Sequence, residues 1–119
     1  MKKILSCIVV LAILCFASLA MAAGDTPCVS SGLQTSSGAI VTGGGHFLCS
    51  VLIITDGTDA VTATLYDNAS AASGKVIFKG TVPGASYFGV GDAGNPIAVG
   101  NGIYLSISGS TPNVIVYYR

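Results

Sequence analysis

The sequence predicts an all-β domain, an antiparallel sandwich or barrel of about eight short strands. Apolar and polar residues alternate with period two in several runs after residue 38. Clusters of Gly, Pro, Asn, Asp and Ser separate these runs at a spacing of roughly 10 residues, as in sandwiches and barrels. No stretch of residues 23–119 shows helical periodicity of useful length. These three observations together indicate the fold class.

The clearest strands are residues 61–66 and 103–108. Each alternates aliphatic residues with Ser, Thr or Tyr, so one face is expected to be buried and the other exposed. The aliphatic side chains are predicted to face the core. Tyr66 and Tyr104 are therefore predicted to stand on the outer face.

Residues 47–55 and 114–118 are apolar on both faces. Such strands are covered on both sides or lie centrally against other elements. Between the strands, residues 56–59 (Asp-Gly-Thr-Asp) are predicted to form a hairpin turn, because Asp and Gly tolerate positive φ angles. Weaker patterns predict four more strands, over residues 39–42, 75–79, 86–90 and 96–99.

Residues 1–22 are predicted to be a secretory signal peptide of bacterial type. Its three parts are a two-lysine start, the apolar residues 4–19 and the small residues that end the segment. The apolar run of about 16 residues is shorter than the roughly 20 that span a bilayer. We therefore expect cleavage after Ala22 or Ala23, no membrane insertion afterwards, and a secreted, periplasmic or cell-surface protein.

The chain that follows the leader is long enough for one small domain. Residues 23–38, rich in Ser, Thr and Gly, are predicted to form a flexible N-terminal arm. Residues 39–119 are predicted to form the β-sandwich domain. Such an arm can add a strand to the sheet of a neighbouring molecule, as in donor-strand pairing.

Charged residues are few, at 8% of the chain, and Glu is absent. Removal of residues 1–22 takes away Lys2 and Lys3 and leaves three basic residues against five acidic ones, a net charge of −2. This balance excludes an electrostatic footprint for nucleic acid or for an anionic membrane. Soluble domains usually carry charge on about a quarter of their residues, and Lys or Glu guard their edge strands. The composition therefore predicts a homo-oligomer or a larger assembly.

Cys7 and Cys15 belong to the leader, which leaves Cys28 and Cys49 as a pair in an oxidising compartment. A disulfide between them is predicted. Closing a loop of about 20 residues stabilises a fold by roughly 3 kcal/mol in the chain-entropy model. The bond would tie the N-terminal segment to the first strong strand. The alternative, a metal site, needs more ligands than this pair and the lone His46 provide.

No catalytic, cofactor-binding or metal-binding residue is predicted. His46 follows a run of three glycines, a setting that can hold a catalytic base, but nucleophilic sites need a base oriented by a carboxylate. Every Asp lies in or next to an expected turn, so His46 is interpreted as a strand-entry residue. Oxygen donors suited to calcium are Asp56, Asp59, Asp67, Asn68 and Asp92. The same residues suit turns through their own backbone hydrogen bonds, and this interpretation is favoured.

Tyrosines expected on exposed strand faces suggest a second hypothesis of function. Aromatic rings stack on sugar rings, so Tyr66 and Tyr104 are candidate ligand-stacking residues, with Tyr87, Tyr117 and Tyr118 as further candidates. The absence of Trp counts against a sugar-binding role, and Tyr commonly fills exposed strand positions. A carbohydrate-binding or adhesive module is therefore the alternative function.

The strand and turn patterns over residues 46–118 resemble the small jelly-roll β-sandwich domains of bacteriophage and prophage structural proteins. The resemblance is carried by residues 51–60, 64–68, 73–75, 82–84, 102–109 and 114–118. It implies a jelly roll without enzymatic residues, of the kind that decorates virions or forms fibre parts. The leader and the cysteine pair favour use of this sandwich outside the cytoplasmic membrane. We therefore expect an exported structural subunit that self-assembles through edge strands and apolar outer faces.

Overall fold

The computed structural model describes residues 26–91 and 94–119, and the expected signal peptide lies outside them. No helix in this part of the chain is long and apolar enough to cross a membrane. The described residues form nine strands: β1 (Val29–Gln34), β2 (Gly38–Thr42), β3 (His46–Thr55), β4 (Val61–Asp67), β5 (Lys75–Val82), β6 (Tyr87–Gly91), β7 (Ile97–Val99), β8 (Gly102–Ser108) and β9 (Pro112–Tyr118). The predicted all-β class is confirmed, and each of the eight expected strands has its counterpart.

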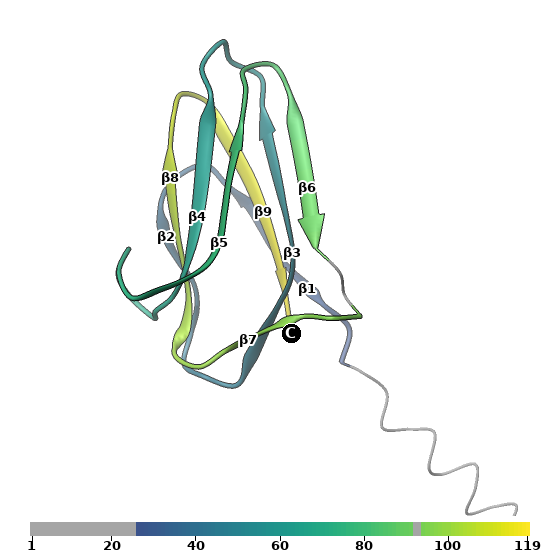
Figure 1. Cartoon of the computed structure of the whole chain (residues 1–119), viewed down its shortest axis with the longest axis vertical. Helices are drawn as coiled ribbons and strands as arrows, with labels where there is room; N and C mark the ends of the chain where they lie inside the picture. The colour runs from purple at the N-terminus through teal and green to yellow at the C-terminus, as the bar shows by residue number, and fades with distance from the viewer. Residues whose placement is uncertain (1–25, 92–93) are drawn as a thin grey trace, which may run out of the picture.

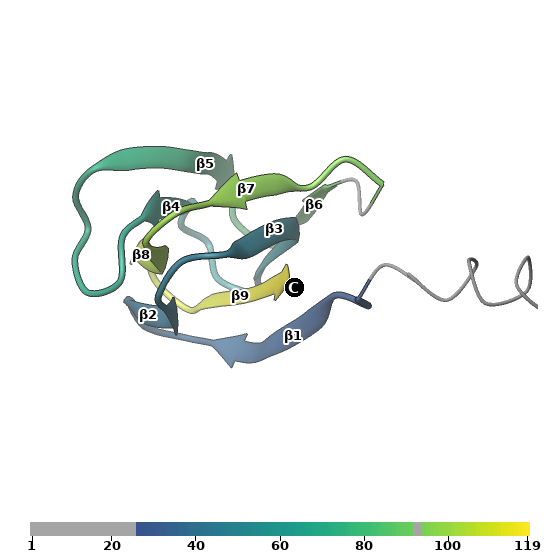
Figure 2. The same ribbon diagram turned by 90° about the horizontal axis from the view of Figure 1, so that it is seen from below.

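The strands form two antiparallel sheets that lie against each other in a sandwich-like arrangement (Figures 1 and 2). One sheet has the order β1-β9-β3-β6, with β7 paired to β3 beyond the end of β6, and the other has the order β2-β8-β4-β5. The pairing is nested: β4 pairs with β5, β3 with β6, β2 with β8, and β1 with β9. The chain is thus arranged like one long antiparallel ribbon whose successive strand pairs alternate between the sheets.

The core lies between the sheets and is aliphatic. Its residues are Leu48, Val51, Ile53, Val99, Val114 and Val116 from the five-stranded sheet, and Val61, Ala63, Leu65, Ile77, Val82, Ile103 and Leu105 from the four-stranded sheet. Burial of each large aliphatic side chain contributes about 1.5–3 kcal/mol. The aliphatic residues of β4 face this core while Tyr66 points outward, as the alternation predicts.

The two strands with apolar residues on both faces occupy the central positions of one sheet. β3 lies between β9 and β6, and β9 lies between β1 and β3. Their inner residues are buried, whereas Leu52, Ile54 and Ile115 on the opposite face are only half-buried. The predicted central placement is confirmed, and the second apolar face has a functional interest described below.

The N-terminal segment differs from its prediction. The sequence suggests a flexible arm over residues 23–38, but Val29–Gln34 is strand β1, paired with β9. The register shifts within β1, where Gly32 has a φ of 71° and the Ser31 Oγ accepts a hydrogen bond from the Val116 N–H at 3.0 Å. A bulge of this kind interrupts the alternation of side chains between faces. That interruption explains why no period-two pattern marks the strand in the sequence.

The prediction of a hairpin turn at residues 56–59 is wrong. β3 belongs to the five-stranded sheet and β4 to the four-stranded sheet, so this turn carries the chain from one sheet to the other. Both strands have an aliphatic face, and crossing between sheets lets the two faces meet in the core. The hairpin of consecutive strands is instead β4–β5, joined through residues 68–74.

Candidate functional site

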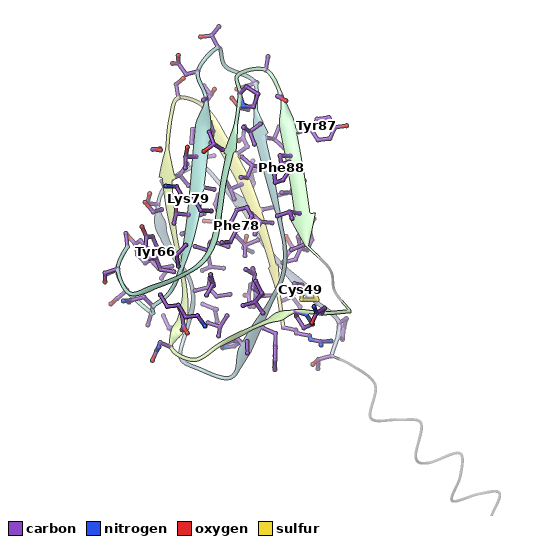
Figure 3. The ribbon with its side chains drawn as sticks, in the orientation of Figure 1. Cys49, Tyr66, Phe78, Lys79, Tyr87 and Phe88 are labelled. Carbon is purple, nitrogen blue, oxygen red and sulfur yellow. A yellow bond between two sulfur atoms is a disulfide. The ribbon has the colours of Figure 1, made fainter. Side chains whose placement is uncertain are left out.

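The predicted disulfide between Cys28 and Cys49 is present, with the two Cα atoms 6.4 Å apart. Cys28 lies just before β1 and Cys49 lies within β3, where its side chain is buried. β1 pairs with β9 and not with β3, so the bond links the residue before β1 to a strand of the same sheet that lies beyond β9. The cross-link therefore fastens the start of β1 to the central strand β3, near the end of the domain where the N-terminal segment enters (Figure 3).

The strands of the five-stranded sheet carry no charged residue, and the Arg119 guanidinium lies 5.7 Å from the centre of the Phe47 ring at one end of the sheet. None of its five strands contains Asp, Glu, Lys or Arg, whereas β4 and β5 of the other sheet contain Asp67, Lys75 and Lys79. Residues paired across neighbouring strands share a face of the sheet. We call the resulting surface the uncharged face, and its large side chains are Leu33, Leu52, Ile54, Tyr87, Ile115 and Tyr117.

The uncharged face runs across four strands in rows. One row joins Leu33 of β1, Ile115 of β9, Leu52 of β3 and Gly89 of β6 through direct register partners. Leu33 is 57% exposed, and Tyr87, one row away, is 77% exposed and projects from the domain (Figure 3). Large apolar patches rimmed by polar residues commonly mark protein interaction sites. This face is therefore the first candidate functional surface.

The outer face of the four-stranded sheet brings the two candidate stacking residues together. Tyr66 and Tyr104 are direct register partners across β4 and β8. The next partners in the same row are Val76 on β5 and Ala39 on β2. Both tyrosines are half-buried. Direct cross-strand neighbours lie about 5 Å apart at Cβ, so the two side chains start side by side on this face, and we call the pair the Tyr66–Tyr104 platform.

Asp67 ends β4 beside this platform. Its carboxylate accepts hydrogen bonds from the backbone N–H groups of Gly100, at 3.1 Å, and Asn101, at 2.7 Å. These bonds lower the pKa of Asp67 below its ordinary value of 3.8, and Lys75, its register partner on β5, adds a smaller effect in the same direction. The carboxylate is thus occupied in holding the loop before β8.

One side of the sandwich is incompletely closed. Phe88 and Val90 of β6 pair with Ile53 and Val51 of β3, whose side chains are in the core. They therefore face inward, yet they remain 46% and 41% exposed. A pocket of about 110 Å³ opens on this side, and Phe78 of β5 is part of its lining. Sequence reasoning missed this opening, because it depends on how far apart β5 and β6 lie at the edge of the two sheets.

The remaining candidate residues are dispersed. His46 is the first residue of β3, as predicted, and its ring contacts the edge of the Tyr118 ring with a centroid distance of 6.1 Å. Asp59 precedes β4 and accepts a hydrogen bond from the Ser110 hydroxyl at 2.8 Å, while Asp67 ends the same strand. Within residues 26–91 and 94–119, no three His, Cys, Asp or Glu side chains gather where they could hold a metal ion.

Asn68 behaves as the turn interpretation predicts. Its side-chain oxygen accepts hydrogen bonds from the N–H groups of Ser70 and Ala71, and its amide nitrogen donates to the carbonyl of Ser73. Asp92 lies outside the described residues. The other tyrosines, Tyr87, Tyr117 and Tyr118, belong to the five-stranded sheet and so are not part of the Tyr66–Tyr104 platform.

No protein-family model matches this chain, and neither a curated protein nor a solved structure matches it. The resemblance to phage structural domains therefore rests on the strand and turn patterns of the sequence alone.

Proposed function

We propose that the protein is an exported structural subunit that assembles with copies of itself in the cell envelope or outside the cell. The observation that carries the proposal is the uncharged face. A sheet without one charged residue in its strands presents no like charges along those strands to a second copy, and burial of its apolar side chains favours association.

We also propose that the domain is a jelly roll. A jelly roll has eight strands in two sheets and is built from two Greek keys. The nested pairing of β1 with β9, β2 with β8, β3 with β6 and β4 with β5 supports this assignment, with β7 as an addition before β8. The resemblance to phage decoration and fibre domains is consistent with a structural role for such a fold.

Export is supported by two independent features. The Cys28–Cys49 disulfide suits an extracellular or periplasmic compartment, where disulfides persist. The sequence of residues 1–22 has the parts of a signal peptide. Expression of the full-length sequence in a bacterial host tests this part: we expect an exported protein whose N-terminus, read by mass spectrometry, is Ala23 or Gly24. An intracellular protein that keeps Met1 would contradict export.

Self-association is tested by sizing the exported protein. Light scattering coupled to size-exclusion chromatography is expected to show a mass that rises with concentration to a dimer or a larger assembly. Leu52→Lys, at the centre of the uncharged face, is expected to lower that mass. The matched control is Thr62→Lys, which adds the same charge at a half-buried position on the outer face of the other sheet. A monomer at millimolar concentration would refute the structural role.

The second candidate is a carbohydrate-binding or adhesive module, favoured by the pairing of Tyr66 with Tyr104 on the outer face of one sheet. Paired aromatic rings offer a flat apolar surface of the kind on which sugar rings stack. A glycan array is expected to show saturable binding that is lost in Tyr66→Ala and in Tyr104→Ala. Binding that survives both substitutions would place any glycan site elsewhere.

The proposed role is not catalytic. His46 contacts Tyr118, and the Asp67 carboxylate is engaged by backbone N–H groups, so neither is arranged as part of an acid–base pair. Turnover of a common hydrolase substrate that disappears in His46→Ala would overturn this assignment.

A further inference from the structure

The edge strands of the two sheets, β1, β6 and β7 of one sheet and β2 and β5 of the other, are not equally protected. Natural sheets guard their edges with bulges, charged side chains or proline. The register of β1 and of β2 shifts at an irregularity, and β5 combines a shift with Lys75 and Lys79. β6 pairs with β3 through five consecutive residues without a shift, and it contains neither charge nor proline. β7 also lacks charge, proline and a register shift, but it has only three residues, and a very short edge strand offers little to pair with. Among the described strands, β6 is therefore the unprotected edge.

The backbone of β6 offers hydrogen-bonding groups on its free side. The Ser86 carbonyl accepts a hydrogen bond from the Thr55 N–H at 2.9 Å, which fixes the phase of the ladder between β3 and β6. In an antiparallel ladder, bonded and non-bonded residue pairs alternate. Phe88 and Val90 therefore bond to β3, and the N–H and C=O groups of Tyr87, Gly89 and Gly91 point away from the sheet.

Gly89 has no explanation within a single copy. A Cβ atom at this position would meet only the Leu52 Cδ1, at 3.5 Å, which is ordinary van der Waals contact. Its φ is not among the positive values that favour glycine. Glycine weakens a strand interior, and one use of it there is to admit another backbone at close range. The residue thus marks the middle of β6 as a place of close approach.

We propose that two copies of the protein pair through antiparallel contact of their β6 strands, related by a two-fold axis at Gly89. This rests on the proposed self-association and adds to the uncharged face a second, edge-to-edge contact between copies. The pairing joins the two five-stranded sheets into one continuous sheet, with the same edge contributed by each copy, as a two-fold contact requires. It also places an additional strand beside Phe88 and Val90, the inward-facing residues that a single copy leaves exposed.

Side-chain sizes support this register. With Gly89 opposite the partner's Gly89, Tyr87 lies opposite the partner's Gly91, and Phe88 lies opposite the partner's Val90. An aromatic ring beside a glycine is a stabilising arrangement in sheets. Within strand β5 the ring of Phe78 likewise lies against a glycine, because a Cβ at Gly80 of the same strand would be 2.8 Å from the ring. A second copy therefore fits this edge better than an extended segment of arbitrary sequence.

The first test alters Gly89, whose backbone N–H points away from β3. Gly89→Pro removes the free N–H without removing a bond to β3, and Gly89→Lys places like charges opposite each other at the two-fold axis. The control is Thr42→Lys, which adds the same charge to the edge strand β2 of the other sheet. In sedimentation velocity of the exported protein, we expect each Gly89 variant to raise the half-dimerisation concentration about tenfold or more. Thr42→Lys is expected to change it by less than about threefold.

The second test reads the register directly. Gly89→Cys brings two thiols face to face across the axis, at a separation of about 5 Å between directly opposed residues, which suits a disulfide. In Tyr87→Cys, the two thiols are offset by four residues, or about 14 Å along the strands. Mild oxidation is therefore expected to link the first variant into a covalent dimer and to leave the second unlinked.

The outcomes separate this interface from the proposed function. An associating wild-type protein whose Gly89→Pro and Gly89→Lys variants associate equally well would refute the β6 interface and leave self-association standing. Equal cross-linking of the two cysteine variants would refute the register. A wild-type protein that stays monomeric at millimolar concentration would remove both proposals. Circular dichroism identifies any variant that fails to fold. In that case Gly89→Cys and Tyr87→Cys test the β6 interface independently.

Discussion

Removal of the disulfide is expected to destabilise the fold more than any other pair of substitutions outside the aliphatic core. The perturbation is Cys28→Ala with Cys49→Ala, which opens the cross-link without introducing a buried hydroxyl. The two residues are separated by 21 positions along the chain. In the chain-entropy model, a closed loop of this length lowers the entropy of the unfolded state enough to stabilise the fold by about 3 kcal/mol. Domains of this size have about 5–15 kcal/mol in total, so the loss is a large share.

Urea denaturation followed by circular dichroism and tyrosine fluorescence measures this loss, since the chain contains no Trp. A slope of about 1–3 kcal/mol per molar urea converts the expected change into a midpoint shift of roughly 1–3 M. The wild-type protein unfolded in the presence of a reductant is the matched control, and its midpoint is expected to agree with that of the double variant. A loss below about 1 kcal/mol would refute the reasoning, because it would mean that the unfolded chain is not constrained by the bond.

Three further substitutions test the core, a buried hydroxyl and a titrating group. Leu65→Ala is expected to lower the free energy of unfolding by about 2–5 kcal/mol, because Leu65 is fully buried; a loss under about 1 kcal/mol would show that the core collapses around it. Thr55→Val is expected to be neutral or to stabilise by about 1 kcal/mol, because the buried Thr55 Oγ1 has no hydrogen-bond partner in the described structure; clear destabilisation on chemical denaturation would contradict this. Because the Asp67 pKa is lowered in the folded state, its carboxylate stabilises the fold above the ordinary value of 3.8, and this contribution is lost as the pH falls through the lower folded value. Melting temperatures measured against pH are therefore expected to fall less steeply for Asp67→Asn than for the wild type, and parallel curves would contradict the assignment.

Much of the local structure could be predicted because it depends on neighbours in the sequence. Alternation in residues 61–66 and 103–108 reports one buried and one exposed face, and both segments are strands with that orientation. The cysteine pair was predictable because two thiols in an oxidising compartment have each other as the simplest partner. β1 was missed because its bulge breaks the alternation on which the prediction depends.

The candidate surfaces were predictable only in part. Apolar residues on the second face of β3 and β9 are visible in the sequence, and they do lie on one outer face. The outward position of Tyr66 and Tyr104 could also be read from alternation, but their direct pairing could not, since nothing local relates β4 to β8. The exposure of Phe88 and Val90 has no local signal at all, because an inward-facing residue at an edge is covered or open according to the strands around it.

The sequence by itself determined the all-β class, the positions of eight strands, the face that each strong strand buries, and the low content of charged residues. The tertiary structure decided which strands are neighbours, and therefore that the turn at residues 56–59 crosses between sheets, that the strand charges gather in one sheet, and that β6 is the unguarded edge. The physical reason is the range of the interactions. Turn preference and alternation act over a few residues, whereas pairing and burial are settled by contacts between segments that are far apart in the chain.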